Sequence, residues 1–338
     1  MLMVNKSKAK SHLVRLCLAV LLVPALAIVS FSGDAPAAGA KKKNLQTGFA
    51  SPEEAVATLV NAAKSDDTME LSAILGPDGK ELISSGDEVA DKNGRARFVR
   101  FYEEKNTVVK ETDTKAVLEV GNEAWPFPIP IVKAGGEWRF DTKAGKQEIL
   151  HRRIGRNELS TIQACLAYLD AQREYAVKDR DRDELLEYAQ KFASEPGSKD
   201  GLYWESKEGE EQSPLGPLVA SAREEGYTRK KAGEKPRPYH GYLFKILTAQ
   251  GRNAPGGALD YMARGQMIGG FALVAYPAEY GSSGIMTFIV SHSGDVYEKD
   301  LGKRTRSVAG AMKTFDPDKS WRKVEPKFID PSVKAGGA

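Results

Sequence analysis

The sequence contains almost no cysteine: among 338 residues there are only Cys17 and Cys165. Cys17 lies in an N-terminal apolar run without a following lipoprotein-type cleavage box, so a lipid anchor is not expected. If that run is removed, Cys165 remains alone, and one thiol cannot form an intrachain disulfide. Stability must therefore come from a buried core, which a chain of this length can supply.

Acidic side chains are missing from the N-terminus before Asp34, whereas four basic residues precede an apolar run from Leu16 to Phe31. Small residues follow the run, and this order is typical of a secretory signal peptide. Cleavage is expected after Ala40, with Ala37 as the alternative site. The run is shorter than the roughly 18–20 residues that a spanning helix needs, which favours cleavage over a retained anchor. The sequence therefore predicts export to the periplasm or the extracellular space, with membrane contact only through this segment if it stays uncleaved.

A cationic excess is also missing once the signal is removed. Residues 1–40 hold four of the 49 basic and one of the 46 acidic residues, so the net charge falls from +3 to zero. Nucleic-acid binding normally requires a clear positive excess, because it depends on the release of counterions from phosphates. We therefore expect no nucleic-acid partner.

Motifs for metals and cofactors are absent as well. His240 and His292 are isolated, with no second histidine at metal-binding spacing, and are interpreted as residues at strand ends. The stretch 281–284 reads Gly-Ser-Ser-Gly and predicts a hairpin turn rather than a nucleophile elbow. No phosphate-binding or dinucleotide-binding glycine loop occurs, and no cofactor is expected.

The remaining pattern predicts an α+β protein with two domains. N-terminal helices pack on a curved antiparallel sheet, and a long helix with a second antiparallel sheet follows. The expected organisation is a signal peptide at 1–40, a linker at 41–48, a cone-like domain at 49–150, a helix plus β-rich domain at 151–324 and a flexible tail at 325–338.

Helix signals dominate the start of the first domain. Ser51 is expected to cap a helix with Pro52 in its first turn, and Asp66 to cap a second one. A third helix is expected from Asp91 to Glu104. β-Branched and aromatic runs then predict strands at 107–110, 115–120, 127–133 and 138–140.

This order of elements, together with the Trp-Pro-Phe-Pro-Ile-Pro stretch at 125–130, resembles the cone-shaped nuclear-transport-factor-like fold. Such cones often enclose a ligand site, which is a fold-level implication only. Five aromatic residues either line such a pocket or pack in the core, and core packing is the favoured interpretation. They are Phe101, Tyr102, Trp125, Phe127 and Trp138.

The second domain is predicted to start with a helix over 156–177, followed by another helix over 185–192 and strands at 239–247, 266–276, 284–291 and 295–299. A long helix before a small antiparallel sheet resembles the globular domains of type IV pilins and pseudopilins. Pilins join the apolar export segment directly to that helix, whereas here a whole domain intervenes, which argues against filament assembly through a membrane-embedded helix.

Across its mature length the chain resembles the exported bacterial family called domain of unknown function 2950. The resemblance rests on stretches that include Phe-Ala-Ser-Pro-Glu-Glu-Ala at 49–55, Arg-Ile-Gly-Arg-Asn-Glu at 153–158 and Met-Ile-Gly-Gly-Phe-Ala-Leu at 267–273. The resemblance implies export and no particular activity.

Cys165 is one candidate for chemistry, as a nucleophile activated by His151 or His240. Its place between apolar residues of the predicted helix favours instead a thiol buried as a small hydrophobe.

Calcium binding is a second candidate, because Asp179, Asp181, Asp183 and Glu187 match positions one, three, five and nine of a calcium loop. Glu184 replaces the turn-making glycine and Gln190 the bidentate carboxylate, so a solvated turn is favoured.

Three functions remain open at this point. The favoured one is a non-enzymatic binding or interaction module for an envelope protein or a small ligand. The second is a hydrolase with a pocket in the cone or at the domain seam, using carboxylates such as Asp113, Glu123 or Asp141. The third is a pilin-like assembly subunit.

Overall fold

The described part of the protein covers residues 46–180, 182–228 and 234–325 of a computed structural model. The predicted signal peptide, both cleavage sites, most of the linker and residues 326–338 of the predicted tail lie outside this part. Within it, no helix has both the length and the apolar character needed to cross a membrane.

Four α-helices open the described chain, and side-chain caps explain where they begin. They are α1 (Pro52–Lys64), α2 (Thr68–Leu75), α3 (Lys80–Ile83) and α4 (Glu88–Glu104). Ser51 caps α1 as predicted, and its hydroxyl accepts a 3.0 Å hydrogen bond from the amide of Glu54. The second cap is Asp67 rather than Asp66, which instead sits in the preceding turn at a positive φ of 57°. Asp87 caps α4, so this helix starts before the predicted Asp91.

The first sheet is antiparallel and has the strand order β1-β2-β4-β5, with β3 beside β2. Its strands are β1 (Asn106–Thr112), β2 (Lys115–Val120), β3 (Trp125–Pro126), β4 (Ile131–Ala134) and β5 (Glu137–Phe140). The strand expected over 127–133 is wrong in extent, since regular pairing is interrupted between β3 and β4. Pro126, Pro128 and Pro130 carry no N–H to donate across a sheet. One hydrophobic core joins this sheet to α1 and α2 and contains the buried Trp138.

Helix α5 spans Thr142–Tyr175 and is 34 residues long. It begins well before the predicted Arg156, because the side chain of Asp141 accepts a hydrogen bond from the amide of Ala144 and so caps the helix. The early turns carry many charged residues, so hydrophobic periodicity did not indicate them. The expected boundary between residues 150 and 151 lies inside this helix, and the division into two domains stays a prediction.

The chain after α5 is mostly irregular until the second sheet. The helix predicted over 185–192 is wrong: Tyr188 instead forms an isolated bridge with Met267, and Leu185 and Leu186 are exposed. A short helix that the sequence did not indicate, α6 (Gly216–Glu224), follows. None of its residues is fully buried, and this property bears on the site described below.

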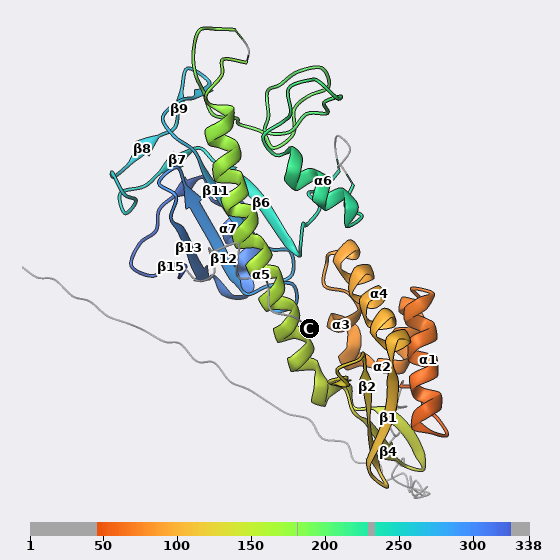
Figure 1. The fold of residues 1–338 in the computed structure, drawn as a ribbon. Helices are drawn as coiled ribbons and strands as arrows, with labels where there is room; N and C mark the ends of the chain where they lie inside the picture. Colours follow the sequence, from red (N-terminus) through yellow and green to blue (C-terminus); the bar gives the residue numbers. More distant parts are fainter. Residues whose placement is uncertain (1–45, 181, 229–233, 326–338) are drawn as a thin grey trace, which may run out of the picture. The chain divides into compact units, whose positions relative to one another are not determined.

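The second sheet is antiparallel, with the order β15-β13-β12-β11-β6, and α5 packs against β11 and β12 (Figure 1). Its strands are β6 (Tyr242–Leu247), β11 (Ala272–Pro277), β12 (Met286–Ser291), β13 (Val296–Asp300) and β15 (Arg322–Lys323). Smaller pairings join β7 (Ala249–Gln250) to β8 (Leu259–Asp260) and β14 (Thr314–Phe315), and β9 (Met262–Ala263) to β10 (Gln266–Met267). A final helix, α7 (Thr305–Ala311), packs beside β11.

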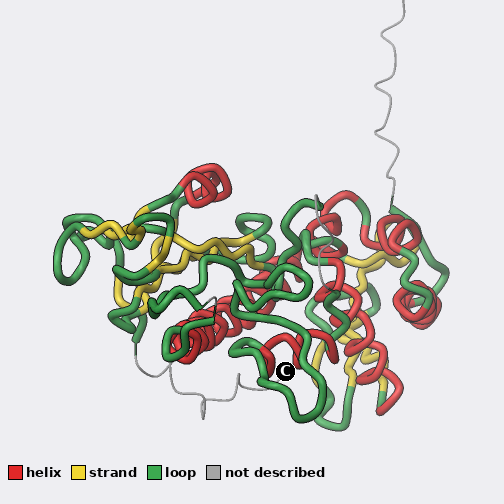
Figure 2. The backbone as a smooth tube through the Cα atoms, turned by 90° about the horizontal axis from the view of Figure 1, so that it is seen from above, coloured by secondary structure: helices red, strands yellow, loops and turns green. Residues whose placement is uncertain are grey.

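A second hydrophobic core lies between this sheet and α5 and includes Cys165, Tyr168 and Phe288. Figure 2 shows how much of the chain around the helices and strands is loop. The fold is α+β, with N-terminal helices and an antiparallel sheet, a long helix and a second antiparallel sheet, as the sequence predicts.

Candidate functional site

The predicted calcium loop lies just after α5. Both carboxylate oxygens of Asp179 accept backbone amides, from Arg182 at 2.7 Å and from Glu184 at 3.0 Å. Asp183 accepts the amide of Leu185 and the side-chain amide of Gln266. These bonds build a turn.

The other two calcium candidates, Asp181 and Glu187, do not complete a metal-binding group in the described residues. Asp181 falls outside the described residues, and Glu187 has a carboxylate oxygen without solvent contact. The described part of the chain contains no group of three or more side chains placed to hold a metal ion. Calcium binding stays a prediction.

Cys165 is completely buried in the second core, and burial raises the pKa of its thiol to about 12. His151 is exposed on the same helix, about 21 Å earlier along the axis. His240 lies at the turn before β6, where its Nε2 is 3.1 Å from Oε2 of Glu225. His292 follows β12, and burial lowers its pKa. The thiol therefore has the environment of a core residue.

The carboxylates proposed for a hydrolase are spread over separate turns. Asp113 is exposed between β1 and β2, Glu123 is exposed between β2 and β3, and Asp141 caps α5. None of the three lines either of the two cavities described next.

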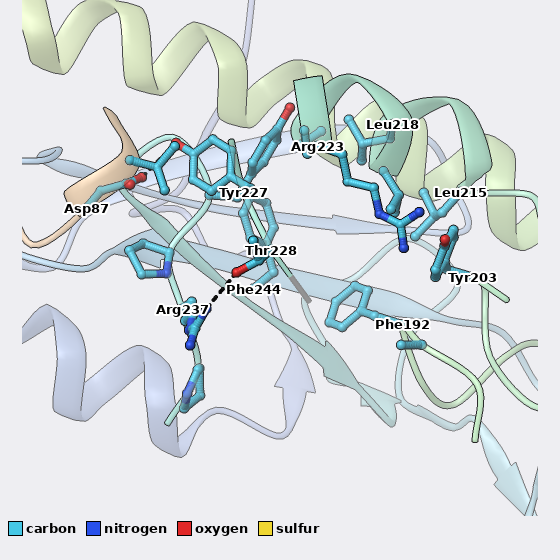
Figure 3. A pocket seen from close by; sticks show the side chains of 18 of the residues that line it. Asp87, Phe192, Tyr203, Leu215, Leu218, Arg223, Tyr227, Thr228, Arg237 and Phe244 are labelled. Carbon is cyan, nitrogen blue, oxygen red and sulfur yellow. Dashed lines mark hydrogen bonds between the residues drawn. The ribbon is translucent and has the colours of Figure 1, made fainter. Parts of the chain in front are cut away.

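The larger cavity, here called the α6 cavity, has a volume of about 1000 Å³ and lies between α6, α5 and the edge strand β6 (Figure 3). Its wall is mainly apolar and aromatic, with Tyr168 and Leu273 from the second core beside it. The other central residues are Phe192, Leu215, Leu218, Val219 and Phe244. A cavity of this size and character is typical of sites for small organic ligands.

Two arginines that line the α6 cavity already have partners. Arg223 pairs with Glu205 at 3.0 Å and lies over the ring of Tyr203. Arg237 donates to the hydroxyl of Thr228 at 2.8 Å, as Figure 3 shows. Glu88 and Lys235 also line the cavity but are exposed, so its apolar and aromatic lining is the part suited to an uncharged, apolar occupant.

Asp87 anchors one end of the α6 cavity and is only 1% exposed. Its Oδ2 accepts hydrogen bonds from the hydroxyl of Tyr227 at 2.9 Å and from the amide of Gly241 at 2.7 Å. The oxygen of Tyr227 in turn accepts the amide of His240 at 3.1 Å. This network ties the start of α4 to the segment before β6 and raises the pKa of Tyr227, through burial and the nearby Asp87 carboxylate.

The smaller cavity, here called the arginine cavity, has a volume of about 470 Å³. One wall is apolar and includes Phe98, Trp125 and Phe127, with the rings of Phe98 and Phe127 5.2 Å apart. Trp125 is 42% exposed, whereas Trp138 is buried in the core. Phe101 and Phe127 line the cavity and also pack against the first core, whereas Tyr102 packs against that core without lining the cavity.

The lining of the arginine cavity also contains five arginines from α4 and α5. They are Arg95, Arg97, Arg152, Arg153 and Arg156. The sequence interpretation missed these arginines and also missed Asp87 and Tyr227. The spacing of Arg152, Arg153 and Arg156 on one helix was a readable signal, because residues three and four apart share a helix face.

The fold is α+β, and its two cavities differ in lining: one is mainly apolar, and the other combines arginines with aromatic side chains. Residues 46–324 match the model of the family described as protein of unknown function (DUF2950), and the chain belongs to this family. No curated protein and no solved structure matches the chain. The resemblances to nuclear-transport-factor-like cones and to pilins stay predictions.

Proposed function

We propose that the protein is a non-enzymatic binding module of the cell envelope and that the α6 cavity binds a small apolar ligand. The observation that carries this proposal is the incomplete burial of α6: an amphipathic helix in a packed protein normally buries its apolar face. Here Leu218 and Val219 of α6 line a cavity of about 1000 Å³ instead of being fully buried.

The size of the cavity supports occupation by a ligand. Protein interiors are close-packed, and an apolar cavity forfeits the dispersion contacts of its lining. A ligand that fills the space restores those contacts. Export rests on the N-terminal sequence pattern and is part of the same proposal.

A neutral apolar fluorescent probe, N-phenylnaphthylamine, tests this site directly. The variant Ala222→Trp places an indole ring on the cavity wall, since Ala222 lines the cavity. Ser221→Trp is the matched control, because Ser221 is exposed on the same helix and does not line the cavity. We expect the wild type and Ser221→Trp to bind the probe, and Ala222→Trp to bind it about tenfold more weakly or worse.

The circular dichroism spectra of the three proteins should agree, which shows that Ala222→Trp folds. If folded Ala222→Trp binds the probe as tightly as Ser221→Trp does, the α6 cavity is not the binding site. Absence of probe binding to the wild type also contradicts the proposal.

A further inference from the structure

The five arginines of the arginine cavity differ in whether they have partners. Arg95 pairs with Asp66 at 2.6 Å, and Arg152 pairs with Glu148 at 2.6 Å. Three of the arginines thus remain to be accounted for.

Arg153 donates to the backbone carbonyls of Glu81 and Leu82, each at 2.6 Å. These bonds hold its guanidinium in place and connect α5 to the end of α3. Arg95, Arg152 and Arg153 therefore have evident structural roles.

Arg97 and Arg156 have none of these partners. Within the described part of the chain, neither makes a hydrogen bond or an ion pair, although both are partly buried in the cavity wall. Burial lowers the pKa of Arg156 to about 10, with a further contribution from the positive charges of Arg97, Arg153 and Arg152. The pKa of Arg97 is also lowered, by burial and by the positive charge of Arg100.

Carboxylates in the lining do not neutralise these two charges. Asp91 and Glu225 are the carboxylate residues of the lining. Asp91 accepts the amide of Ser85 at 2.8 Å, and Glu225 contacts His240. The lining therefore combines a surplus of positive charge with apolar, aromatic side chains.

We infer that the arginine cavity is a second binding site, for an amphiphilic oxyanion whose carboxylate or phosphate head contacts Arg97 and Arg156. The apolar body of this ligand lies against Phe98, Trp125 and Phe127. A planar guanidinium donates two parallel hydrogen bonds to a carboxylate or a phosphate, and such bonds are stronger in a partly desolvated site. The oxyanion supplies the missing negative charge, and the aromatic wall takes up the tail.

Dansyl-undecanoate is a suitable probe, because it joins a carboxylate to an apolar fluorescent body. Its methyl ester has the same body without the charge. We expect the wild type to bind the carboxylate about tenfold or more tightly than the ester, and the preference to shrink as salt is raised. Arg97→Gln and Arg156→Gln should each weaken binding of the carboxylate about tenfold and leave binding of the ester unchanged.

Arg173→Gln is the matched control, since Arg173 is an exposed arginine on α5 outside the cavity. It should bind both probes as the wild type does. Arg156→Lys should retain part of the affinity, because it keeps the charge but loses the planar fork.

Stability measurements separate a binding role from a structural one. Removal of an unpaired, partly buried charge should leave the urea midpoint of ligand-free Arg97→Gln and Arg156→Gln unchanged or raise it. A lower midpoint with unchanged affinity for the carboxylate would show that these arginines are structural, and would overturn the inference. Equal affinity of the wild type for carboxylate and ester would also overturn it.

Competition distinguishes the possible sources of the head group. Dodecyl phosphate displacing the probe at concentrations similar to those of dodecanoate supports a shared oxyanion site. If inorganic phosphate competes equally well, the aromatic residues contribute nothing to the affinity, and the inference that the ligand is amphiphilic is refuted. Ala222→Trp should leave these results unchanged, so the outcome is independent of the α6 cavity.

Discussion

The replacement of Asp87 by alanine tests the network that holds one end of the α6 cavity. Three backbone or side-chain donors lose their acceptor: the amide of Ala90 at the start of α4, the hydroxyl of Tyr227 and the amide of Gly241. Loss of a helix cap costs about 1 kcal/mol. Each buried donor left without a partner costs about 1–3 kcal/mol. The cap and the two further donors together predict that Asp87→Ala lowers the free energy of unfolding by about 3–7 kcal/mol.

Asp67→Ala provides the matched control for this prediction. Asp67 caps α2 with the same kind of side chain, but it is exposed, and its carboxylate accepts only the amides of Met69 and Glu70 in its own helix. Its replacement should cost about 1 kcal/mol. The difference between the two losses of unfolding free energy measures how much burial and the long-range bonds of Asp87 contribute to stability.

A double-mutant cycle with Tyr227→Phe isolates the bond between Asp87 and Tyr227. The measurement is urea unfolding followed by tryptophan fluorescence. We expect an interaction energy of about 1–2 kcal/mol, because the two side chains are in direct contact and Asp87 is buried. An Asp87→Ala cost no larger than that of Asp67→Ala, or strictly additive costs in the cycle, would refute the reasoning.

Three further predictions concern α5 and its neighbours. Cys165 should resist alkylation in the native protein and react readily in urea, because burial raises its pKa to about 12 and keeps the thiol protonated; rapid native labelling contradicts this. Burial raises the pKa of Glu158 in the folded state, so wild-type stability falls as pH rises through the carboxyl's unfolded value. Glu158→Gln should therefore gain in relative stability as pH rises above that value in urea titrations. A relative stability that does not change with pH would contradict the assignment. In thermal unfolding, Gly145→Ala should destabilise, because its Cβ would lie 2.4 Å from the carbonyl oxygen of Pro128, whereas Gly155→Ala meets nothing within 4 Å and should stabilise by up to about 1 kcal/mol; equal effects of the two changes would refute the packing argument.

Much of the fold could be predicted where one local signal dominates. Ser51 and Pro52 mark the start of α1, and the β-branched run over 115–120 predicts β2 with its observed ends. Errors arose where tertiary contacts override local preference. The segment around Leu185 has a helical pattern, yet the amide of Tyr188 bonds to the carbonyl of Met267 at 2.8 Å and the chain stays irregular.

The candidate sites could be predicted less well, because they combine residues that are distant in the sequence. Asp87 bonds to Tyr227 and Gly241, and no periodicity relates these positions. Arg97 and Arg156 lie on separate helices, and only their meeting in one cavity wall gives them a shared role. A histidine or cysteine motif would have been visible in the sequence, whereas a charge without a partner is a property of the folded chain.

At each of the two cavities, side chains depart from the packing or pairing that is usual in a folded protein. A well-packed helix would bury its apolar side chains, but α6 does not. A structural arginine would have a carboxylate or carbonyl partner, as Arg152 and Arg153 do, but among residues 46–180, 182–228 and 234–325 Arg97 and Arg156 have none. Each exception costs stability, and such costs are retained in proteins mainly where function requires them. The coincidence of both exceptions with cavities is therefore a stronger argument for binding than either cavity volume alone.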